Sequence, residues 1–370
     1  MQLSYWEIKN WFTNVDFTIV GSGIVGLHAA LALRERFPSA KILVLEKGIL
    51  PQGASTKNAG FACFGSISEI IDDLKTHTEE EVIQLIQKRY SGLQLLRKNL
   101  GDKALDLKLY GGYELFLKED ESFYEQCMQK MPFINELLQP HFKADVFSKQ
   151  GNQFQFSGIT DQLVFNPFEA QIDTGNMMQA LLKKAHQNDI LILNSQNVTH
   201  HQELNDAVEV ATNGITFKTS KLIFTTNGFA GQLTHNQVQP ARAQVLITKP
   251  IPNISIKGTF HLDRGYYYFR NINDRILLGG GRNLDFESET TTSHDTTEQI
   301  QNRLEALLKN VILPHQSYEI EHRWSGTMGI GTHKNPIVQQ LSNHVYCGVR
   351  MGGMGVAIGS LIGQEVADLI

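Results

Sequence analysis

A glycine-rich run and a glutamate beyond it stand at a spacing that suits ligand recognition. Residues 21–26 read Gly-Ser-Gly-Ile-Val-Gly, and Glu46 lies 20 residues after the last glycine. In such a run, Gly21 permits a tight turn, Gly23 lets the backbone approach a pyrophosphate, and Gly26 lets a helix pack closely on a strand. The carboxylate of Glu46 would accept hydrogen bonds from a ribose diol, which favours an adenosine ribose without a phosphate.

The segments around this run have the order that a dinucleotide-binding unit needs. Residues 17–20 are mostly apolar and predict a buried strand, after which small and apolar residues recur at helical spacing until Pro38. A second apolar strand is expected at residues 42–45, directly before Glu46. Strand, glycine turn, helix, strand and acid together predict a bound dinucleotide, whereas a glycine turn alone would be weak evidence.

The segment after Glu46 suits a loop that wraps a large polar ligand. Residues 53–61 read Gly-Ala-Ser-Thr-Lys-Asn-Ala-Gly-Phe and follow Lys47. Small residues leave room for a ligand, while backbone amides, two hydroxyls, a cation and a side-chain amide supply hydrogen-bond donors. We therefore expect this loop to contact the dinucleotide directly.

An aromatic hairpin is expected in the second half of the chain. Residues 266–270 read Tyr-Tyr-Tyr-Phe-Arg and a second strand-like run follows at residues 275–279. Because alternate strand residues share a face, Tyr266, Tyr268 and Arg270 should point one way. Two interpretations of Tyr268 stay open on the sequence, a ring lining a ligand cavity or an ordinary half-buried sheet residue.

A second glycine cluster lies near the C-terminus. Residues 345–348 predict a short strand, after which Gly352, Gly353 and Gly355 precede an apolar helix. A helix N-terminus favours an anion by about 0.3 to 1 kcal/mol, and Arg350 could add to that field. The cluster therefore predicts a second helix start directed at negative charge.

The loop at residues 53–60 resembles the GAS-x-[RK]-N-[AG]-G stretch of the D-amino-acid oxidase superfamily of flavoproteins, where it passes over the FAD pyrophosphate. Four further segments resemble that family in order and spacing, with Ala243 standing where the family has glycine. They are Asp173-Thr174-Gly175, residues 221–228, residues 240–244, and the C-terminal block from Trp324-Ser325-Gly326 to residues 352–356. Within the superfamily, the sequence is most similar to the branch that includes glycine, sarcosine and γ-glutamylputrescine oxidases.

The resemblance implies an α/β fold, with a Rossmann-like FAD-binding domain interleaved with a mixed-sheet substrate domain. The FAD-binding part is expected at residues 1–78, 151–230 and 318–370, and the substrate part at residues 79–150 and 231–317. Amphipathic helices are expected in the substrate part at residues 79–100 and 296–312.

The resemblance also implies which residues serve the cofactor and the reaction. Those expected to contact FAD are Gly21, Gly23, Ile24, Val25, Gly26, Glu46, Lys47, Ser55, Thr56, Lys57, Asn58, Ala59, Gly60, Phe61, Val198, Thr226, Asn227, Gly228, Arg350, Gly352, Gly353, Met354, Gly355 and Val356. Those expected to serve catalysis are Tyr268, Arg270, Arg242 and Trp324.

The chemistry that the family implies is oxidation of a C–N bond in a small amine or amino acid, by hydride transfer to flavin N5, to give an imine. The substrate amine must be neutral, and a positive field from Arg242, Arg270 or Arg350 would help to deprotonate it. Oxygen or another electron acceptor would then take the electrons.

One departure from the family bears on the substrate. Relatives that oxidise amino acids often carry, shortly after the tryptophan-glycine pair, an arginine that clamps the substrate carboxylate, and Met328 stands there in this sequence. Either Arg270 or Arg242 takes that role, or the substrate has no α-carboxylate. The block also lacks the cysteine to which sarcosine oxidases attach flavin, so we expect non-covalent FAD.

Composition and spacing argue against other kinds of site. Thirty-three basic and 38 acidic residues give a net charge of −5, which disfavours a phosphate-backbone binder, so no nucleic-acid partner is expected. The three cysteines lie far apart and no HExxH or HxxxH spacing occurs, so neither a disulfide framework nor a metal site is expected. No apolar stretch has the ~20 residues of a membrane span, and a cytoplasmic protein is expected.

Other functions stay open on the sequence. A flavin dehydrogenase could pass its electrons to a quinone or a protein acceptor. An RNA-modifying flavoenzyme has an oxidoreductase half of similar appearance, although the acidity of this chain counts against it. A disulfide reductase would need a second dinucleotide fingerprint and a redox CxxC pair, and neither is present.

Overall fold

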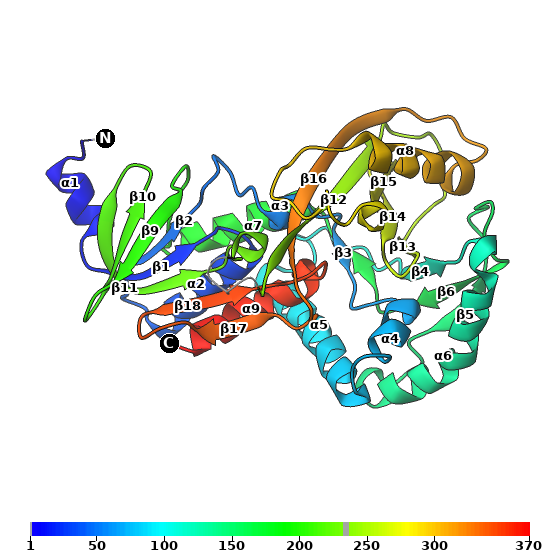
Figure 1. Cartoon of the computed structure of the whole chain (residues 1–370), viewed down its shortest axis with the longest axis horizontal. Helices are drawn as coiled ribbons and strands as arrows, with labels where there is room; N and C mark the ends of the chain where they lie inside the picture. The colour runs from blue at the N-terminus through cyan, green and yellow to red at the C-terminus, as the bar shows by residue number, and fades with distance from the viewer. Residues whose placement is uncertain (1, 232–236) are drawn as a thin grey trace.

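The computed structural model describes residues 2–231 and 237–370 and has two lobes, each built on a large sheet (Figure 1). The first sheet has the order β17-β18-β11-β1-β2-β8, and β10 and β9 extend it from β11. Its strands are β1 (Val15–Val20), β2 (Ile42–Leu45), β8 (Leu191–Leu193), β9 (Val198–Glu203), β10 (Val208–Thr212), β11 (Thr216–Phe224), β17 (Ile337–Gln340) and β18 (Val345–Val349). The neighbours from β18 to β8 pair in parallel, as in a dinucleotide-binding sheet.

Three helices, α2 (Ile24–Arg36), α7 (Thr174–Gln187) and α9 (Gly355–Asp368), share one apolar core with this sheet. Glycines let α9 approach α2 closely: a Cβ on Gly359 would lie 2.9 Å from Cγ2 of Ile24, and one on Gly363 would lie 2.6 Å from the carbonyl oxygen of Val25. Since both contacts advance together along the two helices, α2 and α9 run parallel. Their N-termini therefore meet at the same end of the lobe.

The second sheet has the order β16-β12-β15-β14-β13-β4-β6-β5. Its strands are β4 (Gly112–Leu115), β5 (Ser148–Gly151), β6 (Gln162–Asn166), β12 (Gln239–Thr248), β13 (Thr259–Leu262), β14 (Tyr267–Ile272), β15 (Arg275–Gly280) and β16 (Ile320–Ile330). β13 and β4 pair in parallel, whereas the other neighbours are antiparallel. The mixed sheet expected for the substrate part is present.

The two faces of the second sheet have different environments. Tyr267 and Phe269 of β14 are buried in a core with Ile300 and Leu304 of α8 (Glu298–Leu307). The register places Tyr268 beside His261 of β13, on the opposite face. The alternation expected for Tyr267, Tyr268 and Phe269 is therefore confirmed, whereas Tyr266 precedes β14 and packs against the core of Tyr267.

Sheet pairing differs from the expected division of the chain. β6 and β16 belong to the second sheet, although residues 151–230 and 318–370 were expected in the FAD-binding part. The sequence shows that a segment is extended, but the partner strand is chosen by long-range packing. In addition, α5 (Glu79–Leu100) packs closely on α9: a Cβ on Gly92 would lie 2.3 Å from the carbonyl oxygen of Ala357.

Below the second sheet in Figure 1, α4 (Ile67–Asp73), α5 and α6 (Glu121–Phe142) enclose a further apolar core. α4 begins with a capping box, in which Ser66 and Glu69 bond to each other's backbone amides. This cap fixes Glu69 at the start of the helix. Within the described ranges, no helix has the length and apolar character to cross a bilayer.

Candidate functional site

A cavity of about 1300 Å³ runs between the two lobes and collects residues from both. Its lining includes every residue expected to contact FAD except Gly26, Thr56, Gly228 and Arg350. It also includes Tyr268, but not Arg270, Arg242 or Trp324. The volume of the cavity is sufficient to hold a dinucleotide together with a small molecule.

The start of α2 forms the tightest part of the cavity wall. A Cβ on Gly23 would lie 2.8 Å from Oγ of Ser55, and the amide of Ile24 donates to that oxygen at 3.0 Å. Gly26 lies behind the wall, where a Cβ would meet the carbonyl oxygen of Gly21 at 2.0 Å. Small residues and helical amides thus leave room for a pyrophosphate at Gly23 and close the helix onto its strand at Gly26.

Glu46 is held rigidly at the end of β2. One carboxylate oxygen accepts from the amide of Ser22 at 3.1 Å and from its hydroxyl at 2.7 Å, and the other accepts from the amide of Gly48 at 3.0 Å. A carboxylate has about four lone-pair sites, so one acceptor site is left for a ribose hydroxyl. The residues present therefore fit the adenosine end of FAD.

The loop after Glu46 contains α3 (Ala54–Lys57) and is fastened by the side chain of Asn58. Its amide group donates to the carbonyl of Ser55 at 2.8 Å, and its oxygen accepts from the amide of Gly60 at 2.8 Å. Thr56 turns away from the cavity and donates to the carbonyl of Pro51 at 2.7 Å. Asn58 therefore shapes the loop, while Thr56 stabilises it from outside.

The start of α9 reaches the same cavity, as the second glycine cluster predicts. Gly352 has a φ of +57°, in the left-handed region that favours glycine. The amide of Met351 donates to Oδ1 of Asn227 at 3.0 Å, which ties this turn to the end of β11. Arg350 lies behind the turn and donates to the carbonyl of Asn335 at 2.9 Å, so it fastens the backbone outside the lining.

Tyr268 and Tyr266 line the cavity on the side of the second sheet. The ring of Tyr268 makes an edge contact with Phe61, with 5.6 Å between centroids. Burial raises the pKa of Tyr268 to about 12, so its phenol stays neutral and can donate a hydrogen bond. Tyr268 therefore lines the cavity.

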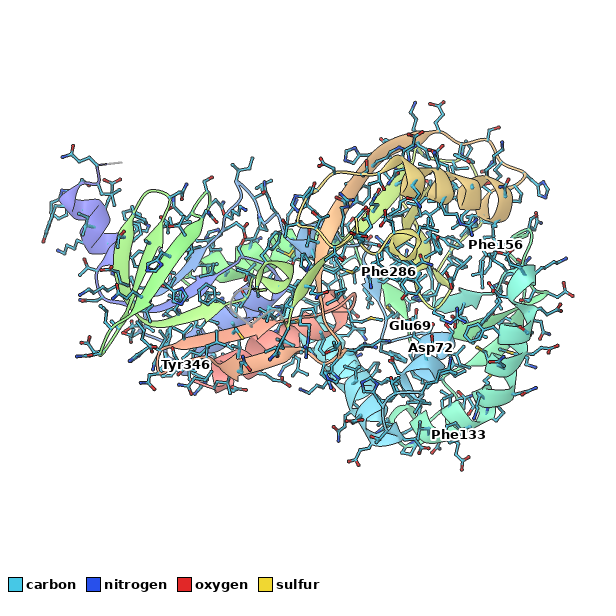
Figure 2. The ribbon with its side chains drawn as sticks, in the orientation of Figure 1. Glu69, Asp72, Phe133, Phe156, Phe286 and Tyr346 are labelled. Carbon is cyan, nitrogen blue, oxygen red and sulfur yellow. The ribbon has the colours of Figure 1, made fainter. Side chains whose placement is uncertain are left out.

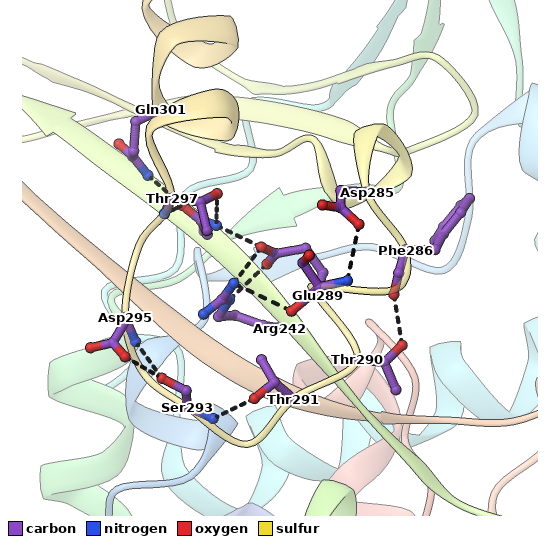
Figure 3. Close-up of polar contacts among 12 residues, drawn as sticks. Arg242, Asp285, Phe286, Glu289, Thr290, Thr291, Ser293, Asp295, Thr297 and Gln301 are labelled. Atoms are coloured by element: carbon purple, nitrogen blue, oxygen red, sulfur yellow. Dashed lines mark hydrogen bonds and ion pairs between the residues drawn. The ribbon is translucent and has the colours of Figure 1, made fainter.

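Arg242, expected near the reaction, is engaged elsewhere. Its guanidinium binds Glu289 at two points, with Nη2 to Oε1 at 2.6 Å and Nε to Oε2 at 2.8 Å (Figure 3). Both side chains are buried, and Gln244 donates to the same carboxylate at 2.9 Å. Arg242 therefore anchors the loop that carries Glu289 and does not line the cavity.

Arg270 and Trp324 also lie outside the lining. Arg270 is only 2% exposed and lies against the turn at Gly60. Burial lowers its pKa to about 10, although the charges of Asp173 and Asp106 act in the opposite direction. Trp324 donates from Nε1 to the carbonyl of Lys57 at 3.0 Å. Both side chains lie behind the loop that lines the cavity and support it.

The fold adds a buried ion pair that the sequence did not indicate. His261 lines the cavity and its Nε2 lies 2.9 Å from Oε2 of Glu169, which also accepts from Thr259 at 3.0 Å. Burial opposes the protonated imidazole, but Glu169, with Glu69 and Glu114 beyond it, outweighs burial and raises the pKa of His261 to about 9. His261 is therefore a cation at neutral pH.

The same place brings three groups within metal-binding reach, where spacing along the sequence predicted no metal site. Ligand atoms of Cys63, Glu169 and His261 lie within 4.8 Å of one another. Burial raises the pKa of the Cys63 thiol well above its usual value. Two of the three groups, His261 and Glu169, are hydrogen-bonded to each other.

Arg282 is a second cavity-lining residue that motif reasoning missed. It follows β15 in a 3-10 turn, Arg282–Leu284, and its guanidinium carbon lies 4.8 Å from the centroid of Phe286. Neither Arg282 nor His261 belongs to a recognisable spacing pattern. The only signal in the sequence is their place beside the aromatic hairpin.

The comparisons with known proteins agree with this geometry. Residues 16–369 match the model of the DAO family, described as FAD dependent oxidoreductase. The chain belongs to this family. A probable oxidoreductase, OrdL, from Haemophilus influenzae is 20% identical over 376 aligned positions, which cover 96% of this chain and 83% of that protein.

Two solved structures have folds similar to that of this chain. Glycine oxidase from Geobacillus kaustophilus has a TM-score of 0.78 at 17% identity, covering 96% of this chain and 94% of that one. Iminodiacetate oxidase from a Chelativorans species has a TM-score of 0.75 at 18% identity, covering 95% and 94%. This DAO-family chain is therefore an FAD-dependent oxidoreductase with the two-part fold of amino-acid and amine oxidases.

Proposed function

We propose that this enzyme oxidises the C–N bond of a small amine or amino acid to an imine, using FAD that is bound without a covalent link. One observation carries the proposal: a single cavity joins the starts of α2 and α9 to the aromatic hairpin. When bound, FAD supplies a hydride acceptor at its N5 atom. Everything else that the reaction needs must come from side chains that bind, orient and desolvate the substrate.

The proposed position of the cofactor follows from the two ends of the cavity. Gly23, Ser55 and Glu46 would hold the adenosine and pyrophosphate part. Ala59, Phe61 and the turn before α9 would border the ring system. The helix start at α9 adds a favourable field for negative charge on the reduced ring.

Non-covalent attachment is supported by the state of the thiols. Burial raises the pKa of Cys127 to about 12 and that of Cys347 to about 11, and it raises the pKa of Cys63 well above its usual value. A thiolate is the reactive form of cysteine, and none of these groups forms one near neutral pH. Denaturation with acid should therefore release all the FAD into the supernatant.

The substrate end has an aromatic wall that includes Phe61 and Tyr268, with charged side chains such as His261 in the lining beside it. Phe61 and Tyr268 would flank the reacting carbon, and the neutral phenol of Tyr268 could accept or donate one hydrogen bond to the amine. His261 lies next to Tyr268 across the sheet, and its charge is balanced by Glu169.

The test is anaerobic mixing of the holoenzyme with amines and amino acids while the flavin absorbance is followed. Bleaching by at least one C–N compound, with release of the matching carbonyl product, is expected. A folded yellow protein that none of the compounds bleaches would overturn the proposal. Tyr268→Phe should lower kcat/KM about 10-fold, whereas Tyr267→Phe, on the other face of the same strand, should leave kcat/KM unchanged.

A further inference from the structure

A thiol, a carboxylate and an imidazole from three separate segments meet beside the cavity. Cys63 directly follows β3 (Phe61–Ala62) and Glu169 directly precedes β7 (Ala170–Gln171), and these two short strands pair antiparallel. His261 belongs to β13 of the second sheet. One ligand atom from each of the three side chains lies within 4.8 Å of the other two, which lets a single ion contact all three.

The carboxylate of Glu169 is held in place by its neighbours. Its Oε2 accepts from Oγ1 of Thr259 at 3.0 Å and lies 2.9 Å from Nε2 of His261. A Cβ on Gly112 would lie only 2.1 Å from the same oxygen, so the glycine leaves the space that the carboxylate occupies. Hydrogen bonds of this kind orient a coordinating side chain before an ion arrives.

The cluster is open to the cavity on one side. Cys63 and His261 line the cavity, whereas Glu169 is 1% exposed and lies outside the lining. Met354, at the start of α9, also lines the cavity, and its Sδ lies 3.8 Å from Sγ of Cys63. An ion held by the three ligands would therefore keep a coordination position that faces the cavity, as in zinc sites with three protein ligands.

The charges of the cluster allow protons to be exchanged for a divalent ion. Burial, and then the charges of Glu169 and Glu69, keep the thiol of Cys63 protonated, while His261 is a cation beside the Glu169 carboxylate. These three charges sum to zero. A divalent ion with a thiolate, a neutral imidazole and a carboxylate also sums to zero, after the thiol and the imidazolium have each released one proton to solvent. The exchange therefore adds no net charge to a buried place.

Carboxylates on the cavity wall favour the entry of a cation. Glu69 and Asp72 of α4 both line the cavity and lie next to each other in the second lobe (Figure 2). Asp72 is paired with Arg264. The charge of Glu69 acts on Cys63, so the negative field of the wall extends to the cluster.

We propose that Cys63, Glu169 and His261 bind a thiophilic divalent cation of the zinc class. A thiolate among the ligands selects against Mg²⁺ and Ca²⁺, which prefer oxygen. The ring of His261 makes an edge contact with Phe61, at 5.3 Å between centroids, so the ion would lie beside the aromatic wall of the cavity. The inference goes beyond the proposed C–N oxidation and does not depend on it.

The experiment uses the purified holoenzyme and Cd²⁺, which gives an ultraviolet charge-transfer band when a thiolate binds it. Wild type should develop this band with one equivalent of Cd²⁺, and Zn²⁺ should abolish it by competition. Cys63→Ser should lose the band. The matched control is Cys347→Ser, which removes a buried thiol from the core of the first sheet and should keep the band.

The competition also gives the affinity for Zn²⁺. It should fall more than about 100-fold in His261→Gln, which removes a ligand, and about 10-fold in Thr259→Val, which removes only the hydrogen bond to Glu169. Without metal, the FAD content and melting temperature of Thr259→Val and Cys347→Ser should be close to those of wild type. Zn²⁺ should raise the melting temperature of wild type and leave that of Cys63→Ser unchanged.

Two results would overturn the inference: no charge-transfer band in wild type, or a band that persists in Cys63→Ser. Should Cys63→Ser fail to fold, unchanged Zn²⁺ affinity in folded Thr259→Val and His261→Gln would overturn it as well. These measurements report binding alone, so their outcome is separate from the flavin-bleaching test of C–N oxidation.

Discussion

The two ends of the cavity are built from different chemical groups. At the cofactor end, glycines and backbone amides dominate, as at Gly23, Ile24 and Gly352, and the charged side chains there include Glu46 and Lys47. At the substrate end, His261 lines the cavity in a buried ion pair with Glu169, and the buried pair of Arg242 and Glu289 lies behind the lining. A site formed by backbone groups has little room for a larger side chain. A buried charged side chain, in contrast, is strongly destabilising once its partner is removed.

This contrast predicts that substitutions at the two ends of the cavity will have different effects. A change at the cofactor end should act through steric fit, and should show no pH dependence of its own. A change at the substrate end should act through electrostatics, and should depend on which partner is removed. Four variants test the contrast, beginning with the largest expected effect.

Glu289→Ala should lower the free energy of unfolding by about 3 to 5 kcal/mol, because it leaves Arg242 buried without a partner. Urea denaturation of the holoenzyme measures the effect. The control is Glu321→Ala, which removes the exposed partner of Arg275 and should cost less than about 1 kcal/mol. Equal losses in the two variants would contradict the role assigned to the buried pair.

Glu169→Gln should change how stability depends on pH. The folded-state pKa of His261 is raised from 6.5 to about 9, so its contribution to stability is fully present below pH 6.5 and is lost as pH rises through about 9. The shift corresponds to about 3 kcal/mol. The difference in melting temperature between wild type and variant should therefore be largest in acid and should shrink through that range.

The matching control for this pH effect is the same substitution in a His261→Gln background. There the pH-dependent part should disappear, because no imidazole titrates. Glu114, whose burial raises its pKa to about 7, contributes in the same direction at lower pH but is common to both proteins. A difference that stays flat across the range would refute the protonated state of His261.

Gly26→Ala should cost about 1 to 3 kcal/mol and reduce FAD retention, because the new Cβ would collide with the carbonyl oxygen of Gly21. Gly53→Ala is the matched control, since a Cβ there meets nothing within 4 Å. The ratio of flavin to protein absorbance after gel filtration gives FAD retention. Full retention in Gly26→Ala would show that the helix start can shift to make room.

Trp324→Phe should have the smallest effect, about 1 kcal/mol of stability, because it removes the hydrogen bond from Nε1 to the carbonyl of Lys57. Turnover per bound flavin should stay as in wild type. A large loss of turnover with flavin and fold intact would mean that Trp324 contacts the substrate after all, and that its role in the loop is secondary.

The sequence-based expectations were also more accurate at the cofactor end than at the substrate end. The fingerprint from Gly21 to Gly26, Glu46 and the loop to Phe61 all border the cavity, apart from Gly26 and Thr56, which support it from behind. These positions are dictated by contacts within one local unit of strand, turn and helix. The expected helix at residues 79–100 coincides with α5, because its capping box and charge pattern are local too.

The substrate end could not be predicted in the same way. Arg242, Arg270 and Trp324 were chosen by residue type and by resemblance, and all three lie outside the lining. An arginine is chemically the same whether a carboxylate such as Glu289, 47 positions away, neutralises it or not. His261 and Arg282 carried no motif, and only their neighbours in space distinguish them.

The amino-acid sequence by itself determined that this chain forms a dinucleotide-binding unit, because glycine conformation, helix periodicity and the placed acid act over a few residues. It also determined which strand residues share a face, because the alternation is a property of the backbone. The tertiary structure decided which charges meet and which strands join the second sheet. Those outcomes depend on distances between segments far apart in the chain, and electrostatic energy in a buried site depends on such distances above all.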